Sequence, residues 1–280
     1  MSIQVILLGT AQDGGVPQAG CYCETCTRAR ETPSARQFVC SLGILDREHK
    51  SFWLVDATPD FREQLHLLQT HARDGEWRGI FITHAHIGHY TGLVHLGREA
   101  MNTRLLPVYG TQAMIAFLGS HAPWKQLVEI GNIQLRQVQP RVPVTCTPNL
   151  SIAPVSVPHR AEFSDTVGYL IRGQSKTLFF CPDVDSWSRC EFDVREFLRE
   201  VDVALLDGTF FAEGELCGRD MGEVPHPLVR QSVELFQNIP TDIRFVHLNH
   251  TNPLWQNGAE RKWLQENGFS IGQQDLCWKL

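Results

Sequence analysis

The stretch THAHIGH (residues 83–89) places three histidines within six residues, directly after the apolar run RGIFI (residues 78–82). A short turn at a strand end can direct two or three imidazoles at one cation, and neutral imidazole is a common ligand for zinc and other transition metals. A lone histidine at such a place would more often be a capping or core residue. Three at this spacing predict a metal centre that includes His84, His86 and His89.

Working outward, other apolar runs predicted to be buried strands also end in residues able to bind a metal. In an α/β fold, such strand ends gather at one edge of the sheet. Amphipathic stretches of helical period (60–71, 192–200, 227–238 and 258–267) lie between many of the runs, which favours sheets covered by helices. We therefore expect the run-ending residues to converge on one centre: Asp56, His84, His159, Asp183, Asp207 and His250.

Length and composition favour one globular domain over residues 1–280. Hydrophobic residues make up 42% and charged residues 20%, as in soluble proteins. With no basic leader and no apolar run of about 18 residues, we expect a cytoplasmic protein with no membrane partner. The net charge of -6 and the lack of a Lys/Arg run argue against nucleic acid. A small-molecule or peptide-derived substrate fits better, and a homodimer is left open.

A second cluster of metal-ligand residues lies near the N-terminus, on a loop at about residues 20–27. Cys21, Cys23 and Cys26 fall within six residues. Thiolates this close repel one another unless a cation neutralises them, and a closed four-ligand zinc site is the usual solution. The nine cysteines are an odd number in a long chain, which makes a disulfide scaffold a poorer explanation. We expect one structural zinc here.

The histidine motif, followed by YTGL, resembles the HxHxDH signature of the metallo-β-lactamase superfamily. The resemblance continues through SVPHR, FFCPD and HLNHTNP, which supply His159, Asp183 and His250. It implies a four-layer αββα sandwich. It also implies that His84, His86 and His159 hold one metal, that His89 and His250 hold a second, and that Asp183 bridges the two.

Two neighbouring positions bear on this centre. Asp56, at the end of SFWLVD, resembles the family's acid that orients a ligand imidazole, although a helix N-cap or a turn explains it equally well. The usual motif aspartate is Gly88 in this chain. The second position would then lack one carboxylate and keep only the shared Asp183, and we expect it to bind its ion less tightly than the first. Asp207 and Thr209 are read as supporting residues or as a strand-end turn.

The fourth ligand of the cysteine site must come from elsewhere in the chain. The CxCxxC loop is similar to that of the pyrroloquinoline quinone biosynthesis B family and of the phosphonate-breakdown phosphodiesterase, in which a late histidine closes the site. That resemblance points to His226 in MGEVPHPLV, with Cys217 as the main competitor. The preceding Gly-rich loop (residues 9–20) lacks the GK[ST] of a phosphate-binding loop, which favours a tight turn at the site entrance. Cys181 is expected to be a buried core thiol.

GTAQDGGVPQAGCYCETC, LLDGTFF and HLNHTNP are most similar to the pyrroloquinoline quinone biosynthesis B family. Members serving that cofactor's synthesis typically lack the first two motif histidines, whereas this chain has them, so its site resembles a metal-dependent hydrolase. A metal-activated water would attack the substrate, with Asp183, His84 and His86 as the catalytic set. One or two catalytic ions are expected, zinc first, with iron or manganese as alternatives. The rival hypotheses are an iron-dependent oxidation in quinone cofactor synthesis and a non-catalytic, metal-stabilised carrier.

Overall fold

The computed structural model describes residues 2–216, 218 and 220–280. Within these residues, two seven-stranded sheets face each other. The first follows the order β14 (Cys277–Lys279), β1 (Ile3–Gly9), β2 (Ser41–Asp46), β3 (Ser51–Val55), β4 (Glu76–Phe81), β5 (Leu106–Gly110) and β6 (Ile133–Gln137). The second follows the order β13 (Ser270–Ile271), β12 (Asp242–Val246), β11 (Val203–Asp207), β10 (Thr177–Cys181), β9 (Thr166–Arg172), β8 (Leu150–Val157) and β7 (Val144–Thr147).

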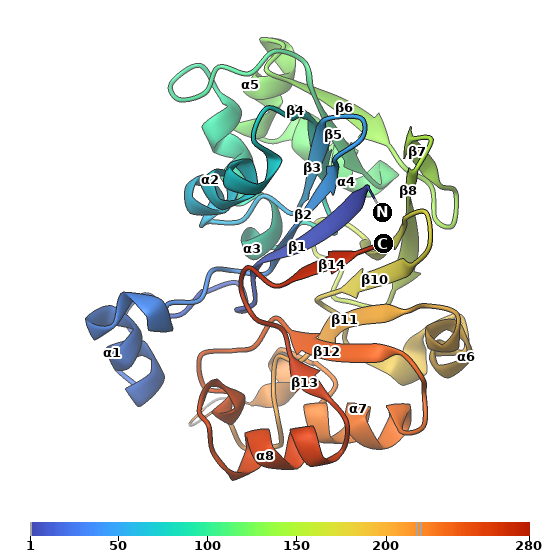
Figure 1. Cartoon of the computed structure of the whole chain (residues 1–280). Helices are drawn as coiled ribbons and strands as arrows, with labels where there is room; N and C mark the ends of the chain where they lie inside the picture. The colour runs from blue at the N-terminus through green and yellow to red at the C-terminus, as the bar shows by residue number, and fades with distance from the viewer. Residues whose placement is uncertain (1, 217, 219) are drawn as a thin grey trace.

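Helices cover the outer faces of both sheets, as Figure 1 shows. The first sheet packs against α2 (Phe61–Ala72), α4 (Gln112–Ser120) and α5 (Trp124–Glu129). The second packs against α6 (Val194–Arg199), α7 (Val229–Phe236) and α8 (Ala259–Glu266). The short α3 (Ile87–Tyr90) follows β4, whereas α1 (Glu24–Glu31) stands away from both sheets (Figure 1).

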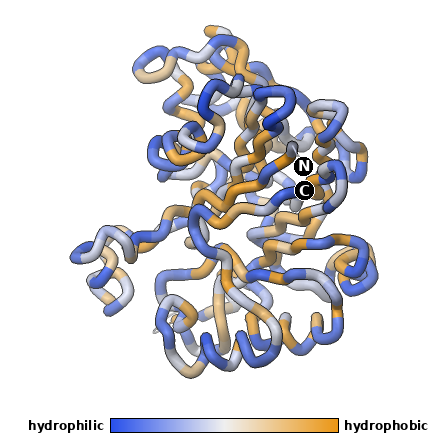
Figure 2. Tube along the Cα trace, viewed as in Figure 1, coloured by the Kyte–Doolittle hydropathy of each residue, from blue (hydrophilic) through white to orange (hydrophobic). Residues whose placement is uncertain are grey.

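The layers follow from burial on both faces of each sheet. A core between the sheets contains Val5, Tyr169 and Leu205, and separate apolar layers lie under each set of helices. The hydropathy-coloured trace in Figure 2 shows the apolar segments concentrated in the strands. β11, for example, is buried along its whole length and runs parallel to both neighbours, which explains the apolar run VALL that precedes its last residue, Asp207. The predicted four-layer αββα architecture is confirmed.

Two differences from the sequence prediction affect the site. The run at residues 242–250 was read as one segment ending at His250, but β12 ends at Val246, and His247 is the first residue beyond it. β2, which was not predicted, pairs with β1 and β3 and places the loop after β1 beside the sheet edge. In the described residues, no helix is both long and apolar enough to cross a membrane.

Candidate metal centre

The first predicted metal position is assembled at the ends of β4, β8 and β10. One ligand atom from each of four side chains lies within 4.8 Å of the others: His84, His86, His159 and Asp183. Oδ2 of Asp183 lies 3.3 Å from Nε2 of His84 and 3.2 Å from Nε2 of His159. Nδ1 of His86 lies 3.0 Å from that same His159 nitrogen. The structure thus brings together the four residues that the sequence assigned to this position.

The second position lies on the other side of Asp183. Nε2 of His89 and Nε2 of His247 each lie 3.9 Å from Oδ2 of Asp183. Asp13, from the loop after β1, places its Oδ1 3.3 Å from Nε2 of His89 and 3.7 Å from Nε2 of His247. Asp183 is therefore shared by two adjoining groups of ligand atoms, as predicted.

Hydrogen bonding tests whether these residues suit metal ions. Buried polar atoms in folded proteins nearly always have partners, because desolvation without one is costly. Several ligand atoms of the centre are buried and lack a hydrogen-bond partner. They are Nε2 of His84, His89 and His247 together with Oδ1 of Asp13 and of Asp183. Imidazole and carboxylate atoms that converge without partners fit divalent metal ions.

The opposite edges of several ligand rings are held by supporting groups, as is usual for metal-binding histidines. Nδ1 of His159 lies 2.8 Å from Oδ1 of Asp185, and Nδ1 of His84 lies 3.0 Å from Oγ1 of Thr83. Nδ1 of His247 lies 2.8 Å from Oγ1 of Thr209. Asp185 stands only two residues after Asp183, and no sequence pattern singled it out.

Asp56 has the orienting place that the resemblance implied. Its Oδ2 lies 2.7 Å from Nδ1 of His89, and its Oδ1 accepts a hydrogen bond from the backbone N–H of Thr83. The alternative of a helix cap is excluded, because the N-cap residue of α2 is Asp60. Asp56 thus aligns His89 and the turn that carries the histidine motif.

His250 was predicted to complete the second metal position, and this placement is wrong. β12 ends at Val246, so His247 lies at the sheet edge, where its Nε2 faces Asp13 and Asp183. Three residues further on, His250 lies in the following loop and faces the cysteine cluster. One sequence feature could have identified His247: it is the first of the two histidines after the apolar run.

His226 was predicted to close the cysteine site, and it lies instead at the reaction centre. Its Nδ1 is 2.8 Å from Oδ2 of Asp207 and 3.4 Å from Oδ1 of Asp183. Asp207 also accepts hydrogen bonds from the backbone N–H groups of Val184 and Thr209, so both of its oxygens are already used. These bonds identify Asp207 as the residue that positions His226.

The structure also corrects the inference drawn from Gly88. The expectation was a second position with no carboxylate besides the shared Asp183, but the carboxylate of Asp13 also lies there. A Cβ atom on Gly88 would stand 2.0 Å from Oδ1 of Asp13. Gly88 is not among the glycines with positive φ, so the glycine is required by space and not by backbone conformation.

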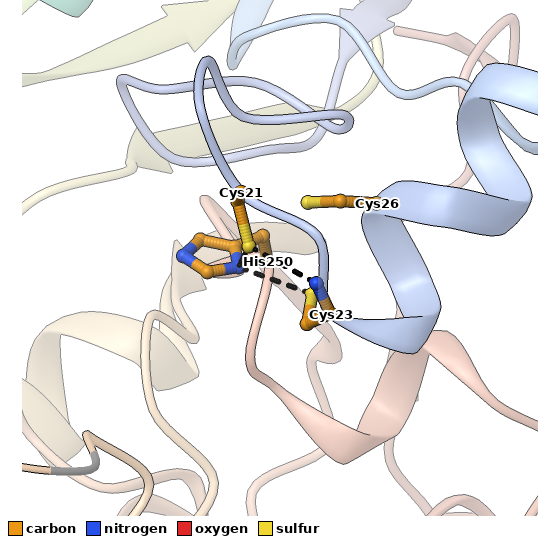
Figure 3. Close-up of side chains that lie close together, drawn as sticks. All are labelled: Cys21, Cys23, Cys26 and His250. Carbon is orange, nitrogen blue, oxygen red and sulfur yellow. Dashed lines mark hydrogen bonds between the residues drawn. The ribbon is translucent and has the colours of Figure 1, made fainter.

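The cysteine cluster is complete, with His250 as its fourth member. Sγ of Cys21 and Sγ of Cys23 lie 3.4 and 3.5 Å from Nδ1 of His250. In Figure 3, the thiol of Cys26, from α1, points toward the same space. A tetrahedral zinc with ordinary bond lengths would separate a sulfur and a nitrogen ligand by about 3.6 Å, so the side chains fit that ion. The competing candidate, Cys217, lies outside the described residues.

Electrostatics differ between the two clusters. Burial, together with the neighbouring thiols, raises the pKa of Cys26 to about 12, although a hydrogen bond from the backbone of Gln18 opposes the shift. Cys26 therefore needs a cation if it is to ionise beside the two neighbouring thiols. At the reaction centre, burial raises the pKa of Asp183, but His159 and other imidazoles outweigh it and hold that pKa well below its usual range. Burial lowers the pKa of His84, which keeps it neutral and able to bind a metal.

The pKa of His226 is shifted strongly in the opposite direction to that of His84. Burial lowers this pKa, but Asp207 and Asp183 outweigh it and raise it to about 9. His226 is one of the residues that line a cavity of about 540 Å³, which is also bordered by Phe210 and Pro225. His226 therefore joins the buried metal centre to a space large enough for a small ligand.

Cys181 is a fully buried core residue, as predicted.

Comparison with known proteins agrees with this geometry. Residues 53–250 match a family described as the beta-lactamase superfamily domain. "Coenzyme PQQ synthesis protein B" of Methylobacterium radiotolerans is 28% identical, with 99% of this chain and 100% of that protein covered. The protein of that name from Rhizobium meliloti is 26% identical, with 99% and 98% covered.

Solved structures show the same fold. Zn(2+)-bound PqqB from Methylobacterium extorquens superposes with a TM-score of 0.85 at 22% identity, covering 99% of this chain and all of the other. A diphosphatase from the PhnP family superposes with a TM-score of 0.69 at 21% identity, covering 99% of this chain and 97% of the other.

Proposed function

Since this chain belongs to the beta-lactamase superfamily and resembles its PqqB members, we propose that it is a metal-dependent hydrolase with two adjoining metal positions. One observation carries the proposal. Buried imidazole and carboxylate atoms converge on both sides of Asp183 without hydrogen-bond partners. Such a set is open and rich in nitrogen and oxygen, whereas a structural zinc site is usually closed and rich in cysteine. Zinc is the first choice of ion, and iron and manganese suit the same ligands.

Ions held here would supply Lewis acidity, which polarises a scissile bond and lowers the pKa of water toward about 7. The protein's own residues supply orientation and proton transfer. Asp185 and Asp56 fix the rings of His159 and His89 through their Nδ1 atoms. Asp183 faces both positions with one carboxylate. These supports reduce the reorganisation needed when a substrate binds.

His226 is the proposed proton donor to the leaving group. Asp207 holds its Nδ1, which also lies 3.4 Å from Oδ1 of Asp183, and His226 is among the residues that line the cavity. A positioned acid of this kind typically accelerates a reaction by about 10² to 10⁴-fold. A donor beside a metal pair favours hydrolysis over electron transfer, because hydrolysis requires protonation of the departing group.

The test is a hydrolysis assay with protein that has been depleted of metal and then reloaded with zinc, iron or manganese. Chromogenic probes cover four bond types: a phosphodiester, a phosphomonoester, a carboxylic ester and a β-lactam amide. We expect turnover of at least one probe by reloaded protein and loss of that turnover in His86→Ala and His226→Ala. Absence of turnover with every metal, combined with oxygen consumption by the iron-loaded protein, would instead support the oxidative alternative.

A second candidate function rests on the comparisons. The relatives called coenzyme PQQ synthesis protein B match over essentially their whole length, so a role in the synthesis of that cofactor is the alternative. Restoration of cofactor production in a bacterium that lacks its own such protein would support it. We further propose a small-molecule or peptide-derived substrate, which suits the cavity beside His226.

A further inference from the structure

The carboxylate of Asp13 lies in the space that a side chain at Gly88 would need. A Cβ atom on Gly88 would stand 2.0 Å from Oδ1 and 2.8 Å from Cα of Asp13. The two residues are 75 positions apart in sequence, yet only one of them can place a carboxylate at this point. The N-terminal loop thus delivers the group that the histidine motif lacks.

The surroundings of Asp13 are those of a ligand. Its Oδ1 and the Nε2 atoms of His89 and His247 are buried and have no hydrogen-bond partner. The distances of 3.3 and 3.7 Å exceed those of ordinary hydrogen bonds, which are about 2.7 to 3.2 Å. Ligand atoms around one tetrahedral ion with bonds of about 2.1 Å stand about 3.4 Å apart. The spacing therefore fits atoms that share a cation.

The imidazole rings of His89 and His247 are also held so that the Nε2 atom of each faces Asp13. Asp56 contacts Nδ1 of His89, and Thr209 contacts Nδ1 of His247. Each ring thus has one supported nitrogen and one free nitrogen, which is the usual arrangement of a metal-binding histidine.

The backbone holds the Asp13 loop against the segment that carries His247. The N–H of Gln12 donates to the carbonyl of Leu248, and the N–H of Leu248 donates to the carbonyl of Thr10. The side chain of Asn249 donates to that of Gln12. These bonds hold Asp13 and His247 next to each other in the fold.

We propose that Asp13 is the carboxylate ligand of the second metal position, in place of the motif aspartate that is Gly88 in this chain. The inference rests on the metal loading that the proposed function requires, and it does not depend on which bond is hydrolysed.

The experiment is a zinc titration of chelator-treated protein, combined with elemental analysis of the saturated protein. Wild type should take up one zinc in the cysteine cluster and two at the reaction centre. Asp13→Ala should weaken the second centre step by about 10 to 100-fold or more and leave the other steps nearly unchanged. Asp13→Asn keeps the shape without the charge and should also weaken that step. Gln12→Ala is the matched control, because it loosens the same loop without removing a ligand.

Exchanging the residues at positions 13 and 88 distinguishes the loss of a metal ligand from a general loss of fold. Gly88→Asp alone should clash with Asp13 and lower the melting temperature. The double variant Asp13→Gly with Gly88→Asp should recover that temperature and the second zinc step. Unchanged binding in Asp13→Ala, with two centre ions in wild type, would overturn this inference alone. Uptake of zinc by wild type in the cysteine cluster only would overturn this inference and the proposed function together.

Discussion

The cysteine cluster and the reaction centre use the same two segments of chain in different ways. The segment that runs from the end of β1 into α1 supplies Asp13 to the centre and three cysteines to the cluster, and the segment after β12 supplies His247 to the centre and His250 to the cluster. The cluster is a sulfur-rich, four-ligand set beside α1, which stands away from the sheets (Figures 1 and 3). The centre is a nitrogen and oxygen set at the edges of both sheets.

The difference shows how one chain separates a closed metal site from an open one. Three thiolates and one imidazole fill a tetrahedral shell and leave no position for a substrate. The centre spreads its ligands over two positions and includes the proposed proton donor, His226, which also lines a cavity. Proximity in sequence does not imply a shared role, since His247 and His250 are three residues apart and serve different sites.

The largest expected effect comes from removing a ligand of the first position. His159→Ala should lower hydrolytic activity by on the order of 10³-fold or more, because a metal ion supplies several kcal/mol of transition-state stabilisation. The cysteine cluster should keep its zinc. Elemental analysis beside the activity assay checks both, and a variant with full centre occupancy would refute the assignment of His159.

Replacing His250 and His226 one at a time tests the comparison between the cysteine cluster and the metal centre directly. His250→Ala should release the zinc of the cysteine cluster and lower the melting temperature by roughly 4 to 8 °C, which corresponds to a loss of about 2 kcal/mol in a chain of this size. His226→Ala should keep that zinc and lower activity by about 10² to 10⁴-fold. The reverse pattern of zinc loss would restore the assignment drawn from the sequence.

The next largest effect is coupling between the cysteine cluster and the second position of the metal centre. Cys23→Ser should release the zinc that ties the loop after β1 to the segment after β12. The second centre position should then weaken by about 10-fold, since support for ligands affects metal affinity on this scale. The first position, built from β4, β8 and β10, should change little. Equal weakening of both centre positions in the zinc titration would argue for general destabilisation instead.

The smallest expected effect is a pH dependence of the metal-free protein. The pKa of His226 is about 9 in the folded state, against an ordinary value of 6.5. A raised pKa stabilises the fold at pH below the ordinary value, and this stability is lost as pH rises through about 9. Melting temperatures of chelated protein should therefore fall between about pH 6.5 and 9.5. His226→Gln should flatten this fall, and an identical slope in both proteins would contradict the ionised pair with Asp207.

The amino-acid sequence alone determined the sheets covered by helices, the three-histidine turn and the three thiol ligands, and its resemblance to a known superfamily added the four-layer sandwich and the first metal position. The features read from the residues depend on local patterns: apolar runs that end in ligand residues, three histidines on one turn, and cysteines two and three residues apart. The tertiary structure decided the rest. The sequence could not determine which late histidine serves which site, because that depends on where β12 ends and on how its following loop turns. It also gave no sign that Asp13 fills the space at Gly88. That exchange joins residues from distant parts of the chain, and only the packing of the first loop against the histidine turn brings them together.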